Sequence, residues 1–380
     1  MDKYLYWLAN IRGLGTPSRE HLLEAFGTGA AIYEAKEKYL AMVLEKAKLE
    51  KLLEMRKTWD IDKEYVGLRE KQIEFVCTAD AEYPERLRNI PDHPFGIYYK
   101  GRMPQPQKLA VAVVGARECS DYGRFIATEL GKELGTAGIQ VISGMARGID
   151  GVSQLAALEA EGESYAILGN GVDICYPREN RPIYDRMLVQ GGVLSTYPPG
   201  TAPKPQLFPP RNRIVSGLAD VLVVVEARQK SGTLITVDMA LEQGREVYAV
   251  PGRITDRLSD GCNKLVKDGA LVFLSPRDFM EGLRQSFPEK LACCTSRPSR
   301  ASGGCALPPI TPEEAVVLET LDLYPQPLER IRDQLQVKLT ERGFRTFSNN
   351  LLTILMHLCL KGVAKQNSPG WFSLDIRERV

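Results

Sequence analysis

The sequence predicts an α/β protein in which a doubly wound parallel sheet is flanked by two smaller modules. Two observations predict the sheet: from Lys108 onward, short apolar segments alternate with glycine turns and helical segments, and the apolar segments carry no polar face. Buried parallel strands have this continuous apolar character, and strand-helix alternation is typical of their connections. At 380 residues the chain is longer than one domain of about 150 residues, so we expect several domains.

Composition divides the chain into five segments. A Tyr/Pro-rich segment separates the first helical region from the sheet, and a Ser/Arg/Gly-rich segment without periodicity follows the sheet. The expected boundaries are 1–70 for a helical domain of helix-hairpin-helix or SAM-like type, 71–107 for a connecting segment, 108–285 for the sheet domain, 286–309 for a flexible linker and 310–380 for a winged-helix domain.

The first segment is expected to be helical. Leu22, Leu23 and Phe26 recur at helical spacing, and the Lys/Glu-rich stretch 35–57 is amphipathic. Residues 11–15, Ile-Arg-Gly-Leu-Gly, predict a glycine hairpin between two short helices. Its backbone amides are candidates for phosphate contact, and a plain helix turn packed inside the domain is the open alternative.

The sheet domain is expected to contain seven short strands and at least three helices that end at glycines. The expected strands are 109–114, 140–143, 165–168, 192–195, 221–226, 246–250 and 271–273, and the expected helices are 122–138, 151–162 and 233–244. Apolar residues such as Ile235, Met239 and Leu241 are candidates for dimer contact or for the core, and the sequence favours the core.

Three helices and a terminal hairpin predict the winged helix. The first helix is expected to start at Thr311, the second at 328–335 and the third at 351–360, and a short strand is expected at 371–374. Arg342, Arg345 and Lys361 are candidates for duplex DNA contact, but the region is not strongly basic, so protein contact stays open.

Charge and composition exclude several classes of protein. Lys and Arg total 49 against 48 Asp and Glu, so the formal net charge is only +1 and a polyanion site has to be a local patch. No apolar run approaches the roughly 20 residues of a membrane span, and the first ten residues lack a signal-peptide layout. We therefore expect a cytoplasmic protein without membrane insertion.

The eight cysteines do not predict a metal site. They form no CxxC pair and no cluster with His, so reduced, unpaired thiols are expected and no metal. Cys293, Cys294 and Cys305 lie close together in the expected linker, where incidental thiols are favoured over a redox or metal role.

The loops after the strands decide what the sheet binds, because ligands of open parallel sheets lie at the carboxyl ends of the strands. The loop at 115–124 lacks the further glycines of a dinucleotide site, the loop at 143–150 offers glycine amides with a hydroxyl and a guanidinium, and no P-loop occurs. We therefore expect no nucleotide cofactor. Gly169 and Gly171, after the third strand, favour turn geometry.

The segment 204–213 is predicted to be a proline-stiffened loop with cations, an amide and a ring. Arg and Lys suit phosphates, a ring face suits a base and Asn suits a base edge, which is the combination that single-stranded nucleic acid requires. The alternatives are that Arg211 and Arg213 pair with Asp220 or Glu226 and that Phe208 fills the core.

The same blocks closely resemble the DNA processing protein family known as DprA or Smf. The match is strong over about 108–283. The blocks that carry it are 114–117 with 122–123, 143–150, 176–177 with 179–180, 197–200, 208–218, 231–236, 240–245 and 250–252.

This resemblance implies a Rossmann-like sheet domain that binds single-stranded DNA, forms a homodimer and loads RecA recombinase onto incoming DNA in natural transformation, without catalysis. It assigns two sets of residues by motif position. Those implied to line the DNA pocket are Arg117, Ser143, Arg147, Lys204, Phe208, Arg211 and Arg213, and those implied to shape it or donate amides are Gly144, Gly169, Asn212, Gly232 and the adjacent Thr233.

An enzyme of the same wider fold group is the alternative. Nucleoside-monophosphate phosphoribohydrolases of the LOG type carry a phosphate turn followed at once by glutamates. Residues 231–236 keep the turn but lack those acids, and Asp238, the nearest acid, is expected on a solvated helix face. Release of free base from nucleoside monophosphates would favour the enzyme.

Overall fold

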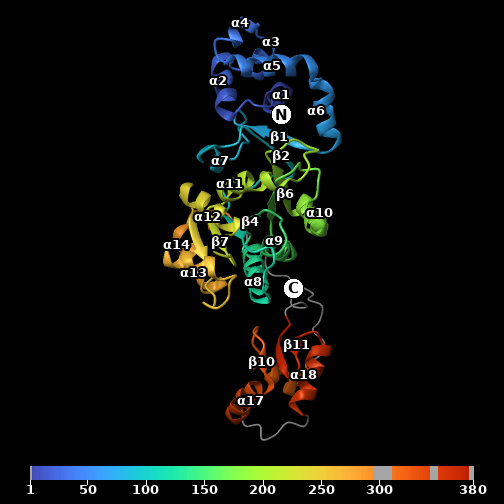
Figure 1. Ribbon diagram of the computed structural model, residues 1–380, viewed down its shortest axis with the longest axis vertical. Helices are drawn as coiled ribbons and strands as arrows, with labels where there is room; N and C mark the ends of the chain where they lie inside the picture. Colours follow the sequence, from blue (N-terminus) through green and yellow to red (C-terminus); the bar gives the residue numbers. More distant parts are fainter. Residues whose placement is uncertain (1, 295–309, 343–349, 376–380) are drawn as a thin grey trace.

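The computed structural model describes residues 2–294, 310–342 and 350–375. A helical module lies at one end of an elongated molecule, the large sheet with its covering helices lies in the middle, and a small module of helices and strands lies at the other end (Figure 1). No helix in the described ranges is both long and apolar enough to span a bilayer.

All regular structure before residue 71 is helical. Side-chain caps fix several helix starts; for example, the Asp2 carboxylate accepts hydrogen bonds from the backbone N–H of Tyr4 and Leu5. Trp7 and Leu8 are fully buried at the centre of the module. The helices are α1 (Lys3–Asn10), α2 (Thr16–Phe26), α3 (Gly29–Glu34), α4 (Glu37–Leu40), α5 (Lys46–Thr58) and α6 (Ile61–Glu70).

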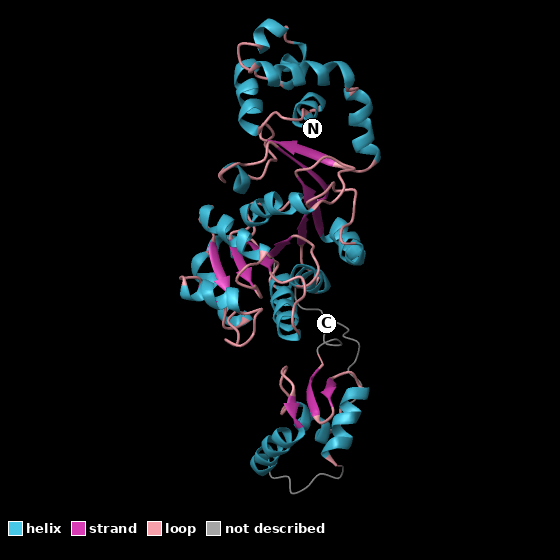
Figure 2. Cartoon of the chain, in the orientation of Figure 1, coloured by secondary structure: helices cyan, strands magenta, loops and turns pink. Residues whose placement is uncertain are grey.

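The middle of the molecule is one nine-stranded sheet, shown in magenta in Figure 2. Its order is β1-β2-β6-β5-β4-β3-β7-β8-β9, and the seven strands from β6 to β9 in this order are parallel to one another. The strands are β1 (Glu74–Cys77), β2 (Gly96–Gly101), β3 (Ala110–Val114), β4 (Gln140–Ser143), β5 (Ser164–Ile167), β6 (Gly191–Ser195), β7 (Val221–Val224), β8 (Glu246–Ala249) and β9 (Leu271–Val272).

The chain winds outward from β3 in both directions, through β4 and β5 on one side and through β7, β8 and β9 on the other. This reversal between β3 and β7 defines a doubly wound, Rossmann-like sheet and confirms the predicted fold class. The connecting and covering elements are α7 (Glu85–Arg88), α8 (Asp121–Thr136), α9 (Ile149–Glu159), η1 (Arg178–Asn180), α10 (Arg181–Gln190), η2 (Pro205–Leu207), α11 (Phe208–Leu218), α12 (Gly232–Glu242), α13 (Asp260–Lys267), α14 (Pro276–Ser286) and α15 (Pro288–Ala292).

Residues 71–107 do more than connect two parts of the chain. They supply β1 and β2, and β2 pairs antiparallel with β6 through Tyr98 opposite Ser195. The rings of Tyr6, Phe75 and Tyr98 meet at centroid distances of 5.0 to 6.1 Å. The helical module and this end of the sheet therefore share one apolar core.

Two local expectations of the sequence analysis differ from the structure. The segment 204–213 is not a continuous loop: η2 and the first half of α11 occupy it, because Pro209 and Pro210 stand in the first helical turn, where proline is tolerated. Strand β9 is not buried, since Leu271 and Val272 are exposed at the sheet's edge.

The last module joins helices to a three-stranded sheet in the order β10-β12-β11. Thr311 and Glu314 form a capping box at its first helix, and Phe372 is fully buried in its core. Its assignment as a winged helix stays a prediction. The elements are α16 (Pro312–Leu318), β10 (Gln326–Pro327), α17 (Leu328–Arg342), α18 (Leu351–Leu360), β11 (Ala364–Ser368) and β12 (Trp371–Leu374).

The expected linker 286–309 begins inside regular structure, because α15 occupies its first residues. Cys293 is exposed and Cys294 is buried, while Cys305, like Arg345, lies outside the described residues. The last module contacts the sheet domain through Tyr324, whose ring lies under the Arg253 guanidinium at 3.4 Å from the centroid.

Asp220, just before β7, joins several elements. Its carboxylate accepts two hydrogen bonds from the Arg86 guanidinium, at 2.8 and 3.1 Å, and one from the backbone N–H of Ala110 at 3.0 Å. The Lys290 ammonium of α15 donates to Asp220 Oδ1 at 2.5 Å. Asp220 and Arg86 are both almost fully buried, so this ion pair fixes α7 and β3 to the sheet's centre.

We predict that Asp220→Ala lowers the free energy of unfolding by about 3–5 kcal/mol, because it leaves the Arg86 charge buried without its partner. Lys290→Ala, which removes the half-exposed partner, is the control and should cost about 1 kcal/mol or less. Urea unfolding followed by circular dichroism measures both. Equal losses in the two variants would contradict the assigned role.

Candidate nucleic-acid interface

A small pocket of about 60 Å³ opens at the carboxyl ends of β3, β4 and β5. The loops that follow these three strands and the start of α11 form its walls. It is lined by Arg117, Gly144, Ala146, Arg147, Leu168, Gly169, Asn170, Tyr176, Pro177, Phe208 and Arg211. Of the residues that the sequence analysis placed in a site, it therefore brings together Arg117, Gly144, Arg147, Gly169, Phe208 and Arg211.

Arg211 forms the floor of this pocket rather than a free cation. It is 6% exposed, and its Nη1 donates to the backbone carbonyl oxygens of Gly144, at 2.8 Å, and of Ile167. The backbone N–H of Gly144 donates to the buried Asp150 carboxylate at 3.1 Å. Arg211 therefore ties the ends of β4 and β5 to α11, and neither Asp220 nor Glu226 pairs with it.

Burial shifts the pKa of both Arg211 and Asp150. It lowers the pKa of the Arg211 guanidinium to about 10, while the Asp150 carboxylate opposes that shift. Burial also raises the pKa of Asp150, and Arg211 opposes that shift in turn. Arg211 stays cationic at neutral pH, and Gly144 is needed between the two groups because a Cβ there would lie 2.5 Å from the guanidinium nitrogens.

Two aromatic rings and one exposed guanidinium stand at the pocket's mouth. The rings of Phe208 and Tyr176 stack with centroids 5.8 Å apart and planes 19° apart, and Tyr176 is 44% exposed. The Arg117 guanidinium lies 5.6 Å from the Phe208 centroid. Gly169 permits this stack, because a Cβ there would meet the Phe208 ring at 2.6 Å.

Further cations border the pocket. Arg147 is exposed and pairs with the equally exposed Glu179, an ion pair that water screens and that a phosphate can replace. Lys204 is exposed on the segment before η2, just outside the pocket. Arg213 and Asn212 are half-buried on α11, and the Asn212 side-chain oxygen accepts a hydrogen bond from Arg211 at 3.2 Å.

Besides Lys204, Asn212 and Arg213, three more predicted residues do not line the pocket: Ser143, Gly232 and Thr233. Ser143 is fully buried and donates to the Val113 carbonyl oxygen at 2.6 Å, so its hydroxyl holds β3 against β4. Thr233 donates to the Gly115 carbonyl oxygen at 3.3 Å, and the exposed Gly232 begins α12. Thr233 and Gly232 thus place the start of α12 beside the loop after β3, at the crevice between β3 and β7.

Glu226 follows β7 in that crevice. Its carboxylate accepts hydrogen bonds from the backbone N–H, at 3.0 Å, and the hydroxyl of Ser120. Burial raises the pKa of Glu226, and these hydrogen bonds oppose the shift. Among the described residues, no group of three or more His, Cys, Asp or Glu side chains is placed to hold a metal ion.

Sequence reasoning missed Tyr176 and Asn180 as site residues, although both stood in recognised blocks. Tyr176 precedes Pro177 in the loop after β5, and a ring in that position is the signal that could have found it. The Asn180 side chain donates to the carbonyl oxygens of Met145 and Ala146, at 3.0 and 3.1 Å, and holds the loop after β4 in place.

The chain is similar to known proteins over most of its described length. The family profile of DNA recombination-mediator protein A matches residues 74–284. DNA processing protein DprA of Bacillus subtilis is 40% identical over 216 residues, which cover 57% of this chain and 73% of that protein.

Two solved structures are similar as well. The X-ray structure of DNA processing protein A from Streptococcus pneumoniae superposes with a TM-score of 0.65 at 32% identity, over 74% of this chain and 98% of that one. The structure of DNA processing protein A from Helicobacter pylori superposes with a TM-score of 0.51 at 26% identity, over 56% of this chain and 96% of that one. With the strand order and the pocket at the carboxyl ends of β3–β5, these matches show that the chain belongs to the DNA recombination-mediator protein A family, also known as DprA or Smf.

Proposed function

We propose that this protein binds single-stranded DNA at the pocket beside Phe208. The observation that carries the proposal is the Arg117 guanidinium over the Phe208–Tyr176 stack. An unpaired base can stack on an aromatic face, and adjacent guanidinium and ammonium groups can bind the phosphates of the strand. A base inside a duplex is already stacked on its neighbours, so this arrangement favours the single strand.

The family supports the same ligand. The Helicobacter pylori relative is described for its single-stranded DNA binding mode. In our proposal the protein protects single strands in the cytoplasm and loads RecA recombinase onto them during natural transformation and recombination. Duplex DNA or protein contact by the last module stays open.

We further propose a binding role without catalysis. Glu226, the buried acid of the crevice, is held by Ser120. Asp238 is exposed on α12. The competing proposal is a phosphoribohydrolase of the LOG type. If the protein releases free base from nucleoside monophosphates, this enzyme activity replaces the proposal of binding without catalysis.

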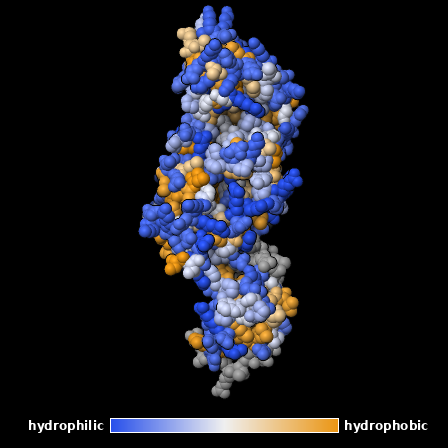
Figure 3. Space-filling view, in the orientation of Figure 1, coloured by the Kyte–Doolittle hydropathy of each residue, from blue (hydrophilic) through white to orange (hydrophobic). Residues whose placement is uncertain are grey.

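Exposed apolar side chains support a homodimer. They lie on α12, in the loop after β8 and along the edge strand β9, and Figure 3 shows apolar residues gathered on this side of the sheet domain. They are Ile235, Leu241, Ile254, Leu271, Val272 and Leu274. Ile235 and Leu241 are exposed, so the core role expected for them is wrong. An edge strand with exposed apolar neighbours can pair with a second copy, and we propose dimer contact for these residues.

We predict that Arg117→Ala and Phe208→Ala each weaken binding of a labelled oligothymidine by about 5- to 100-fold, because each removes part of the base-stacking face. Only Arg117→Ala should also flatten the salt dependence, by about 0.7 in the slope of log K against log salt, since it alone removes a phosphate contact. Fluorescence anisotropy across a salt series measures both effects.

Arg277→Ala is the matched control, because Arg277 lies 91% exposed on α14, away from the pocket. Its affinity should equal that of the wild type. Unchanged binding by Arg117→Ala and Phe208→Ala would refute the pocket assignment, and tighter binding of a duplex of equal length would refute the preference for single strands.

We predict that Leu274→Glu converts a dimer into a monomer of about 42.3 kDa, because it places a charge among the apolar side chains of the β9 edge. Light scattering after gel filtration measures the mass. Val189→Glu, at a similarly exposed position on α10, is the control and should stay dimeric. A monomeric wild type would contradict the dimer.

We predict that the wild-type protein shortens the lag before RecA assembles on single strands coated with single-strand-binding protein, and that Arg117→Ala does so less well because it binds the strand more weakly. The RecA ATPase rate reports assembly. An unchanged lag with wild-type protein that binds the strand would contradict RecA loading and leave strand binding intact.

A further inference from the structure

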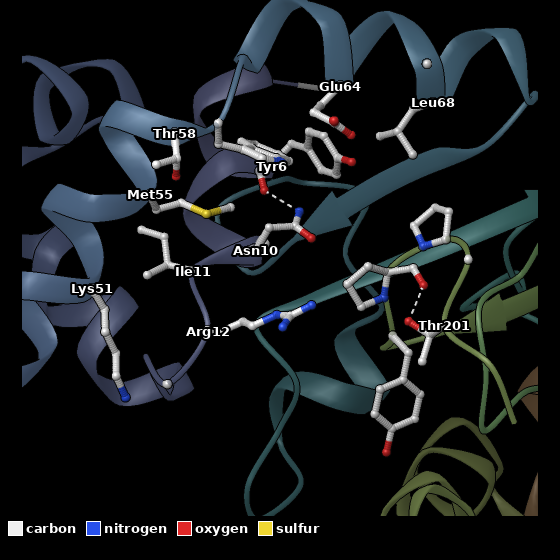
Figure 4. A pocket seen from close by; sticks show the side chains of 18 of the residues that line it. Tyr6, Asn10, Ile11, Arg12, Lys51, Met55, Thr58, Glu64, Leu68 and Thr201 are labelled. Carbon is white, nitrogen blue, oxygen red and sulfur yellow. Dashed lines mark hydrogen bonds between the residues drawn. The ribbon is translucent and has the colours of Figure 1, made fainter. Parts of the chain in front are cut away.

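A cleft of about 1420 Å³ lies between the helical module and the sheet domain, apart from the Phe208 pocket. Its helical wall comes from α1, α5, α6 and the link between α1 and α2. Its other wall is the segment from Tyr197 to Leu207 (Figure 4). At this size the cleft exceeds ordinary small-ligand pockets of about 300–1,000 Å³.

The cleft is positively charged although the whole chain is almost neutral. Five basic and two acidic side chains line it: Arg12, Arg19, Lys51, Lys71 and Lys204 against Glu54 and Glu64. Lys71 pairs with Asp173 at 3.6 Å. Arg12, Lys51 and Lys204 are exposed, and none of the three has a carboxylate partner within the described parts of the chain.

Arg19 connects α2 to the end of α1 and to the link that follows it. The Arg19 guanidinium donates to the carbonyl oxygens of Leu8, Ala9 and Ile11, at 2.7 to 3.1 Å, and thereby fixes the start of the link. Burial lowers the pKa of Arg19 to about 10, so it stays charged at neutral pH. Arg12 follows Ile11 in the link, and Figure 4 shows its side chain extending into the cleft toward the loop of Thr201.

Lys51 lies close to the same link. A Cβ on Gly13 would approach the Lys51 ammonium to 2.4 Å, and Gly13 has a φ of +84°, which favours glycine. The Lys51 ammonium therefore lies against Gly13, and the link 11–15 and α5 bring Arg12 and Lys51 to the same side of the cleft.

The cleft and the Phe208 pocket are separated by one short segment. Lys204, Gln206 and Leu207 line the cleft, and Phe208, the next residue, lines the pocket. The Tyr197 hydroxyl donates to the Leu207 carbonyl oxygen at 3.2 Å and holds this segment in place. A polymer bound at Phe208 therefore reaches the cleft by passing over η2.

We propose that single-stranded DNA leaving the Phe208 pocket passes over η2 and continues through this cleft, where Arg12, Lys51 and Lys204 contact its phosphates. The proposal rests on strand binding at Phe208, which it extends. Tracks of unpaired cations that follow a backbone are typical of single-strand channels. The helical module thereby lengthens the binding site instead of serving only as a scaffold.

The test is the length dependence of binding. The variant Arg12→Ala/Lys51→Ala should bind an oligothymidine of about 20 nucleotides about 10- to 30-fold more weakly near 0.1 M salt, with a salt slope smaller by about 1.4, because two phosphate contacts are lost. Its affinity for a strand of about 6 nucleotides, which the Phe208 pocket fills, should stay unchanged.

Lys46→Ala is the matched control: Lys46 is exposed on the same helix α5 but does not line the cleft. Arg117→Ala should weaken both strand lengths, which separates the pocket from the cleft. Equal affinity of the wild type and Arg12→Ala/Lys51→Ala for the long strand would overturn the cleft proposal while leaving the pocket standing. Loss of short-strand binding in Arg12→Ala/Lys51→Ala would also overturn it, because the effect would not be confined to the cleft.

Discussion

The site depends on one buried guanidinium. Arg211 reaches from α11 to the carbonyl oxygens of Gly144 and Ile167, so it joins the ends of two adjacent strands to the helix that crosses them. Burying a charge is unfavourable, and here Asp150 and two carbonyl oxygens offset that cost. Arg211 acts by positioning: its hydrogen bonds hold the loops after β4 and β5 at a fixed distance from α11. Phe208, one helical turn before Arg211, is thereby placed at the mouth of the pocket.

The same contact sets the positions of the Phe208 pocket and of the cleft. Because α11 is fixed, the η2 segment before it has a fixed start, and Tyr197 holds that segment from the other side. The small pocket then opens on one side of η2 and the large cleft on the other. The shared core of Tyr6, Phe75 and Tyr98 completes this arrangement, since it holds the helical wall of the cleft against the sheet.

Local patterns predicted the central strands well, because their continuous apolar runs reflect burial on both faces. They failed for β1 and β2, because the tyrosines and prolines around these strands are typical of a connecting segment, and only the pairing of Tyr98 with Ser195 shows that β2 belongs to the sheet. The motif blocks brought most of the pocket lining together, but no local signal separates a cation that faces solvent, such as Arg117, from one that is buried, such as Arg211. That difference arises from tertiary contacts between segments far apart in the sequence.

A chain with a net charge of +1 can still attract a polyanion if its acids are engaged elsewhere. Two buried carboxylates here are engaged away from the cleft: Asp220 by Arg86 and Lys290, and Glu226 by Ser120. Arg117, Lys204, Arg12 and Lys51 face the two hollows without such partners among the described residues. Salt-sensitive binding therefore follows from the placement of charges rather than from their sum, which is why the composition alone did not reveal it. Attraction confined to these hollows also favours a narrow single strand over a duplex, whose two backbones would need cations across a wider face.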